Sequence, residues 1–272
     1  MIPTTVMAVL ASSLFMKMGK PLCLRLKTGK NRSSKFASDE EVIKAAAFLE
    51  TRKYGAYLGG TTELNKEEGI TYNPDKNVIY IAISSIEKAM EDNYKNIEPA
   101  NHVRLPKNKC GGIYEMVLDE NYNGTKLRAI LVGKPLEQAD PDYSKYADEY
   151  YCHPDYIANP DNIMYIGRDI LLIGEDSSKH ITNMVWAYNV NTGTLTRIAT
   201  VPTGGEVTGN FTRGLIGRNY TLWLNVQHPL RDKFVNAKGE IVNLELINSA
   251  TEAEKRGIVG YIEGIPQGLF PY

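Results

Sequence analysis

Three acidic residues recur at equivalent places in the sequence, each at the start of a unit of short β-rich segments. Glu68 lies in EGITYN, Asp161 in PDNIMY and Glu206 in EVTGNF. In a fold built from repeated β-sheets around an axis, equivalent positions converge at one mouth, so we expect these carboxylates to meet there. Converging carboxylates repel one another and are costly to bury unless cations or hydrogen bonds compensate.

The side chains around this expected mouth are hard oxygen donors, which favours calcium or magnesium over zinc. Asn162 directly follows Asp161, and Glu175 and Asp176 of the GEDSS turn stand behind the recurring carboxylates. An alternative interpretation is that these residues cap turns by accepting hydrogen bonds from backbone amides. Recurrence at three equivalent positions argues for a metal site, whose predicted ligands are Glu68, Asp161, Asn162 and Glu206.

Gln227 and His228 stand at the end of a β-rich segment in NVQHP, where a side chain can point toward the same mouth. His228 is a candidate to bind phosphate or to donate a proton, and Gln227 is a second candidate catalytic residue beside it. The alternative is a structural histidine that is hydrogen-bonded to a loop. No two of the four histidines have the i, i+4 spacing of a helical zinc site, which disfavours a zinc protease.

Short strands must position these residues, because β-branched and aromatic runs separated by turn residues dominate the chain from Glu68 onward. No helix of ordinary length separates the runs, which disfavours a parallel α/β sheet. Earlier in the chain, residues 38–58 have helical spacing, with Ser38 as N-cap, Glu41 three residues later, and Gly59 and Gly60 at the end. We therefore predict an all-β fold preceded by one N-terminal helix.

The β-rich runs repeat in units of four strands, which is the layout of a propeller blade. EGITYNPDKNVIYIAISS with GGIYEMVLDENYNGTKLRAILV parallels PDNIMYIGRDILLIGEDSS with NMVWAYNVNTGTLTRIATV, and a third unit begins at GEVTGNFTRG. The spacing from Asp161 to Glu206 fits a blade of about 40–50 residues. The first unit is longer, and its insertions at residues 87–109 and 134–158 are typical of surface loops.

Composition excludes several classes of partner and site. Lysine plus arginine number 31 and aspartate plus glutamate 32, so we expect no nucleic acid and no anionic membrane as partner. The apolar run at residues 6–15 is too short for a membrane span and lacks the basic flank of a signal peptide.

Three cysteines without C-x-x-C spacing indicate neither a zinc knuckle nor a disulfide scaffold. Cys110 and Cys152 can pair only if the two insertions meet, and two separate buried thiols are the simpler expectation.

An ordered series of stretches resembles the PhoX alkaline phosphatase family. They run from Ala47 to Pro229 and are AFLETRKYGAYLGGTTELNKEEGITYNPDKNVIYIAIS, IANPDNIMYIGRDILLIGED, NMVWAYNVNTGTLTRI, PTGGEVTG and NVQHP. The resemblance implies a periplasmic or secreted phosphomonoesterase, built as a six-bladed β-propeller with calcium and ferric ions at its axial mouth. It implies metal ligation by Glu68 and Glu206, and a metal-binding or supporting role for Asp161 and Asn162. The implied substrate is a phosphate monoester, whose oxygens the cations bind.

The sequence also departs from the family pattern. It has no W-G-T-x-L-x-C-E-E segment, and Cys23 in PLCLRLK lacks the flanking residues of the family's iron-binding cysteine, so the iron site is not transferred to it. Thr203 and Gly204 leave no arginine beside Glu206, where family members often have a basic residue. The first blades and a twin-arginine export signal are also missing.

We therefore expect a partial, truncated propeller over residues 35–272, after a weakly matching segment at residues 1–34. An open ring leaves unpaired strand edges, and a second chain is one source of the missing blades. Three functions stay open: a metal-dependent phosphatase subunit, a non-catalytic calcium-binding half-propeller, and a lactonase-like propeller hydrolase.

Overall fold

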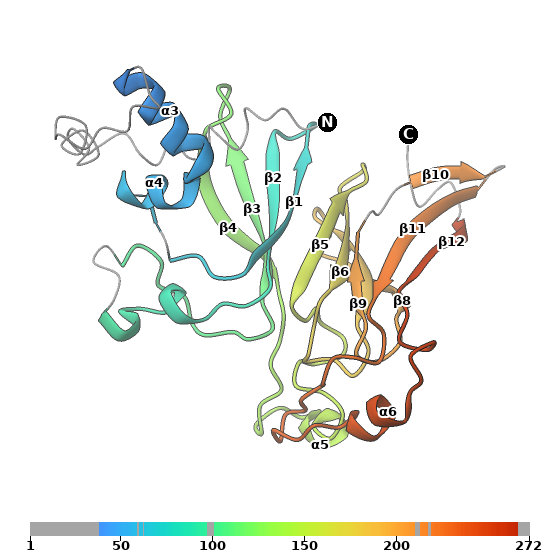
Figure 1. The fold of residues 1–272 in the computed structure, drawn as a ribbon. Coiled ribbons are helices and arrows are strands. Elements are labelled where there is room, and N and C mark those ends of the chain that lie inside the picture. The colour runs from blue at the N-terminus through green and yellow to red at the C-terminus, as the bar shows by residue number, and fades with distance from the viewer. Residues whose placement is uncertain are drawn as a thin grey trace.

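The computed structural model describes residues 38–58, 60–61, 63–96, 101–209, 213–216 and 219–265. The opening apolar run, the segment at residues 1–34 and Cys23 lie outside these ranges. The described part of the chain has an all-β fold with a few short helices, as the sequence predicts (Figure 1). None of the helices in the described ranges is long and apolar enough to cross a bilayer.

Two helices replace the single helix expected at residues 38–58. Helix α3 spans Asp39–Leu49, and the side chain of Ser38 caps it by accepting a hydrogen bond from the Glu41 amide at 3.2 Å, as predicted. Helix α4 spans Thr51–Tyr57. Between them Glu50 leaves the helical region, and the hydroxyl of Thr51 donates to the Ala47 carbonyl at 2.6 Å. This side-chain bond competes with the backbone for the same carbonyl, which accounts for the break.

The first two sheets are antiparallel and follow chain order. The first contains β1 (Glu67–Asn73), β2 (Val78–Ile83), β3 (Gly112–Leu118) and β4 (Gly124–Val132). The second contains β5 (Pro160–Tyr165), β6 (Ile170–Glu175), β7 (Met184–Asn189) and β8 (Leu195–Thr200). Each is a meander of four neighbouring strands, so the predicted four-strand units are confirmed for this part of the chain.

The third sheet differs from this pattern. It contains β9 (Glu206–Thr208), β10 (Arg213–Ile216), β11 (Asn219–Gln227) and β12 (Ile258–Ile265). Strands β9 and β10 both pair with β11, at its end and its start respectively, and β12 also pairs with β11. The expected meander is therefore replaced by an interrupted first strand, a long second strand and a third strand reached after helix α6 (Leu244–Ser249).

Successive sheets meet through their first strands. The amide of Tyr165 in β5 donates to the hydroxyl of Thr71 in β1 at 2.9 Å, and Asn162 in β5 donates to the Val207 carbonyl in β9 at 3.2 Å. At Gly69 a Cβ atom would lie 2.3 Å from the carbonyl oxygen of Asp161, so only glycine permits this approach of β1 to β5. The first strands of the three sheets, each of which carries one of the recurring acidic residues, therefore lie next to one another in the order β1, β5, β9 (Figure 1).

Two apolar layers explain why β2 is buried along its whole length. Because strand side chains alternate between faces, Val78, Tyr80 and Ala82 pack in a cluster with residues of the second sheet. Ile79 and Ile81 point the other way, into a cluster that includes Met90 of the first insertion. A further cluster joins the second and third sheets around Leu172, Val185, Val207 and Leu222.

The two insertions are more deeply embedded than the surface loops that the sequence predicts. The first contains 3-10 helices η1 (Lys88–Met90) and η2 (Tyr94–Asn96), and Met90 is fully buried. The second contains helix α5 (Tyr143–Tyr146), and Ile157 near its end is fully buried. Cys110 and Cys152 form a disulfide with a Cα–Cα distance of 6.0 Å, so the expectation of two separate thiols is wrong. The disulfide thus joins the second insertion to the residue that directly follows the first.

Candidate metal centre

Two of the three recurring acidic residues converge, and a third carboxylate joins them. Asp161 is the second residue of β5 and Glu206 the first of β9, so both stand at the start of the first strand of a sheet. Asp176 directly follows β6, the strand that pairs with β5. One oxygen from each of the three side chains lies within 4.8 Å of the others, and all three residues are half-buried. We call these three residues the carboxylate cluster.

Glu68 lies beside the carboxylate cluster. Its Oε1 atom forms an ion pair with the Nζ atom of Lys66 at 3.0 Å, and its charge helps to raise the pKa of Asp161. Lys66 has a left-handed backbone conformation with φ of 56°, immediately before β1. The expected convergence therefore holds for Asp161 and Glu206, whereas Glu68 faces a lysine at the edge of the group.

Burial and mutual repulsion shift the acidity of the carboxylate cluster. Burial is the main cause that raises the pKa of Asp161 to about 6, and the charges of Glu68 and Asp176 add to it. Burial likewise raises the pKa of Glu206 to about 7, with a further contribution from the charge of Asp176. The pKa of Asp176 is raised as well, again mainly by burial. Such a group binds protons or a cation readily, and its oxygen donors fit a hard cation such as calcium.

A second group of potential ligands shares Glu206. The Nε2 atom of His228 lies 3.0 Å from Glu206 Oε2, and its Nδ1 atom lies 3.6 Å from Asp232 Oδ2. Potential ligand atoms of these three residues also lie within 4.8 Å of one another. His228 follows the end of β11 with φ of 34°, and this turn aims the imidazole back at Glu206. A set of one imidazole and two carboxylates suits a transition metal better than the all-oxygen cluster does.

Asn162 and Gln227 contact the acidic residues through their amide groups. The Asn162 nitrogen donates to Asp161 Oδ1 at 3.0 Å and to the Val207 carbonyl at 3.2 Å, so it holds Asp161 toward β9. Gln227 is exposed, and its nitrogen reaches Glu206 Oε2 at 3.4 Å. The structure thus places both residues at the site, and their predicted roles as ligand and catalytic group stay predictions.

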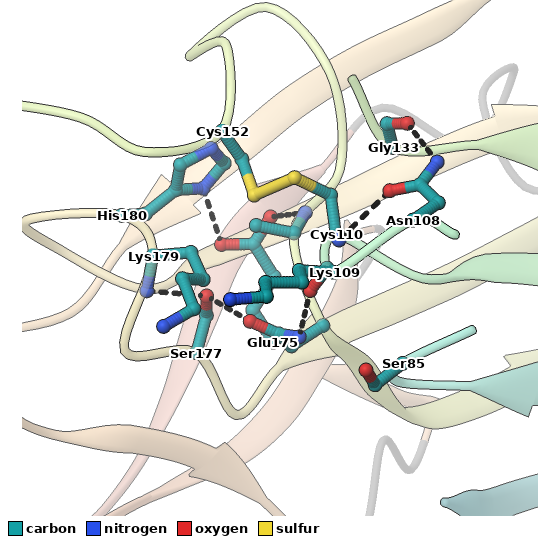
Figure 2. The surroundings of a disulfide bond; sticks show 12 residues. Ser85, Asn108, Lys109, Cys110, Gly133, Cys152, Glu175, Ser177, Lys179 and His180 are labelled. Carbon is teal, nitrogen blue, oxygen red and sulfur yellow. Dashed lines mark hydrogen bonds and ion pairs between the residues drawn. A yellow bond between two sulfur atoms is a disulfide. The ribbon is translucent and has the colours of Figure 1, made fainter. Parts of the chain in front are cut away.

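Glu175 is the one sequence-level candidate that the structure removes from the site. Its side chain is fully buried and accepts hydrogen bonds from the amides of Ala158 and Met184 and from the indole of Trp186. It also contacts His180 Nδ1 at 2.9 Å (Figure 2). These partners occupy both carboxylate oxygens inside the core, so the expectation that Glu175 stands behind the metal ligands is wrong.

The described residues do not fit a thiolate-bound iron site. Cys110 and Cys152 are joined in the disulfide, which withdraws both sulfur atoms from metal binding (Figure 2). The potential ligand groups at the carboxylate cluster and around Glu206 contain histidine and carboxylates and no cysteine among the described residues. The cysteine ligand implied by the family resemblance is therefore not supplied by this part of the chain.

Sequence reasoning underrated three residues of this site. Asp176 is an oxygen donor of the GEDSS turn, but the turn alone does not show that it, and not Glu175, faces the cluster. Asp232 follows NVQHP by a few residues and Lys66 precedes β1, and neither belongs to a repeated motif. The repeat is a signal that points to Asp176, because it directly follows the second strand of its unit as His228 does in the third.

Comparisons with known proteins agree with the resemblance read from the sequence. A sequence model of the alkaline phosphatase PhoX family matches residues 14–230. The fold is similar to that of Pseudomonas fluorescens PhoX in complex with vanadate, a transition state analogue, with a TM-score of 0.54 and 20% sequence identity. That alignment covers 85% of this chain and 38% of the Pseudomonas protein, so the chain spans well under half of the length of that structure. A search of curated proteins finds no match.

Proposed function

The chain belongs to the PhoX alkaline phosphatase family, and from that premise we propose that it forms the metal-binding face of a phosphatase that hydrolyses phosphate monoesters. The observation that carries the proposal is the carboxylate cluster, in which one oxygen of each side chain lies within 4.8 Å of the others, near the starts of β5 and β9 and the end of β6. The likeness to a phosphatase solved with a transition state analogue supports the same reaction class.

In this proposal Asp161, Asp176 and Glu206 would hold calcium, and Glu68 beside them would be a further carboxylate ligand. The bound cation supplies charge that neutralises the phosphate oxygens. Asn162 keeps Asp161 oriented by its two hydrogen bonds. His228, whose Nε2 atom lies 3.0 Å from Glu206 Oε2, would bind phosphate or pass a proton to the leaving oxygen, and Gln227 would add an amide donor at the rim. Ferric iron has no thiolate ligand in the described residues, so no step is assigned to it.

The three sheets fit consecutive blades of an incomplete six-bladed β-propeller, because their first strands adjoin in the order β1, β5, β9. The missing blades would come from another part of a longer protein or from a second chain.

The disulfide between Cys110 and Cys152 supports a periplasmic or secreted location, since such bonds persist in oxidising compartments.

The test is the release of p-nitrophenol from its phosphate ester at alkaline pH, with calcium and iron supplied. The chain is assayed alone and together with the blades that it lacks, and each sample is compared with an EDTA-treated one. Glu206→Gln should abolish the activity, because it removes a ligand common to both groups. Glu120→Gln, a change at an exposed residue of the β3–β4 turn, should leave the activity unchanged. Activity that persists in EDTA and in Glu206→Gln would refute the proposal.

A non-catalytic calcium-binding half-propeller is the second candidate, because the chain spans only 38% of the phosphatase structure that it resembles. It predicts calcium-dependent stabilisation without release of p-nitrophenol, even when the missing blades are added. A lactonase-like hydrolase would instead cleave lactones and leave the phosphate ester intact.

A further inference from the structure

A cavity of about 580 Å³ adjoins the carboxylate cluster, and its walls are rich in lysine. Asp176 and Asp232, which belong to the two groups of potential metal ligands, both line this cavity. The other charged groups on its walls are Glu87 and five lysines: Lys66, Lys88, Lys109, Lys179 and Lys233. The cavity therefore carries more positive than negative charge, and the excess grows when a cation neutralises the two aspartates.

Two of these lysines lie over one aromatic ring, and neither of them forms a direct ion pair with a carboxylate of the described residues. The Nζ atoms of Lys109 and Lys179 lie 5.8 Å and 5.2 Å from the ring centre of Tyr151. Burial lowers the pKa of Lys179, and the charge of Lys109 lowers it further. Glu87 is occupied elsewhere, because it forms an ion pair with Lys107 at 3.3 Å and accepts a hydrogen bond from Ser85 at 2.7 Å. The charge of Glu87 reaches both Lys109 and Lys179, but this one carboxylate also pairs with Lys107, so positive charge is in excess around the two lysines.

The disulfide and the backbone around it hold the two lysines in place. Lys109 immediately precedes Cys110, and its carbonyl accepts a hydrogen bond from Asn159 at 2.8 Å. The carbonyl of Lys179 accepts from the amides of Tyr151 and Cys152 at 3.0 Å and 3.1 Å. Figure 2 shows Lys109 and Lys179 on the same side of the disulfide. Segments far apart in the sequence are therefore joined so that two like charges face one cavity, an arrangement that an anion would stabilise.

We propose that this cavity binds a second phosphoryl group of the substrate, so that the preferred substrates carry two phosphate groups, as in a sugar bisphosphate or a nucleoside diphosphate. The inference rests on the proposed phosphatase function. One phosphate lies at the carboxylate cluster with its cations, and the other lies between Lys109 and Lys179. Lysine ammonium groups bind phosphate as point charges with several donors. This pair supplies positive charge on the wall of the cavity that Asp176 of the cluster also lines.

The first experiment measures anion binding independently of catalysis. Inorganic phosphate is titrated calorimetrically into the EDTA-treated chain at pH 7.5 and low salt. The Lys109→Gln/Lys179→Gln double variant should bind phosphate at least about tenfold more weakly, because two charged hydrogen bonds are lost. Lys126→Gln, which removes an exposed charge on β4 outside the cavity, should bind as the parent does. Circular dichroism checks that all variants are folded. Absence of phosphate binding by the parent, or equal binding by the double variant, overturns the proposal.

The second experiment tests substrate choice in the sample that hydrolyses p-nitrophenyl phosphate. The double variant should lose about tenfold or more in kcat/KM for fructose 1,6-bisphosphate relative to p-nitrophenyl phosphate, which has a single phosphate. An unchanged ratio would overturn the substrate preference. If no sample hydrolyses any ester while phosphate binding still depends on the two lysines, the phosphatase proposal fails and the anion site stands.

Discussion

Replacing Asp161 with asparagine should make the metal-free protein more stable at pH 8 and should change its stability little at acidic pH. The folded protein raises the pKa of Asp161 from 3.8 to about 6, mainly by burial. The native state therefore binds the proton more tightly than the unfolded chain does. This contribution to stability is present below the unfolded pKa and is lost as the pH rises through about 6.

The size of the effect follows from the two pKa values. One pKa unit corresponds to about 1.4 kcal/mol, so the full difference amounts to roughly 3 kcal/mol. Much of this stabilising contribution is lost below pH 5. Because Asp161 is only half-buried, solvent screens the part that remains. Between pH 5 and pH 8 we expect Asp161 to lower the free energy of unfolding by about 1 kcal/mol.

Urea unfolding followed by circular dichroism, in EDTA at pH 5, 6, 7 and 8, measures this dependence. The advantage of Asp161→Asn over the parent should grow by about 1 kcal/mol across the series, whereas Glu120→Gln should follow the parent. At pH 8, calcium should stabilise the parent by mass action and stabilise Asp161→Asn much less. A difference between variant and parent that stays constant with pH, or full calcium stabilisation of the variant, would refute the account of the cluster.

Other predictions concern the parts that hold the site together. Gly69→Ala should lower the free energy of unfolding by about 2 kcal/mol or more, because the new Cβ would collide with the Asp161 carbonyl; an unchanged melting temperature would show that β1 and β5 can separate freely. The double variant Cys110→Ser/Cys152→Ser should lose about 4 kcal/mol in urea unfolding, since the bond closes a loop of 42 residues, and reduction of the parent should match it. Glu175→Ala should cost about 3–5 kcal/mol by leaving buried donors unpaired, and a loss below 1 kcal/mol would contradict the role of this carboxylate in the core.

Local patterns in the sequence were sufficient for most of the secondary structure. The start of α3 at Asp39 follows from Ser38, a short polar side chain that can accept a backbone hydrogen bond. The turn from β7 to β8 follows from two residues. The side chain of Asn189 accepts hydrogen bonds from the backbone amides of Asn191 and Thr192, and Gly193 has a φ of +72°. The repetition of the units predicts that Asp161 and Glu206 lie close together, because equivalent residues of neighbouring sheets occupy equivalent positions.

The sequence by itself determined the family, the β-sheet units and the recurring acidic residues, since these depend on local preference and repetition. Only the tertiary structure decided which carboxylates meet. Glu175 and Asp176 are neighbours at the end of a strand, and alternation sends them to opposite faces, but strand register alone fixes which one enters the core. The pairing of Cys110 with Cys152, and with it the juxtaposition of Lys109 and Lys179, depends on how two insertions fold over the sheets. Such contacts join residues that share no local pattern.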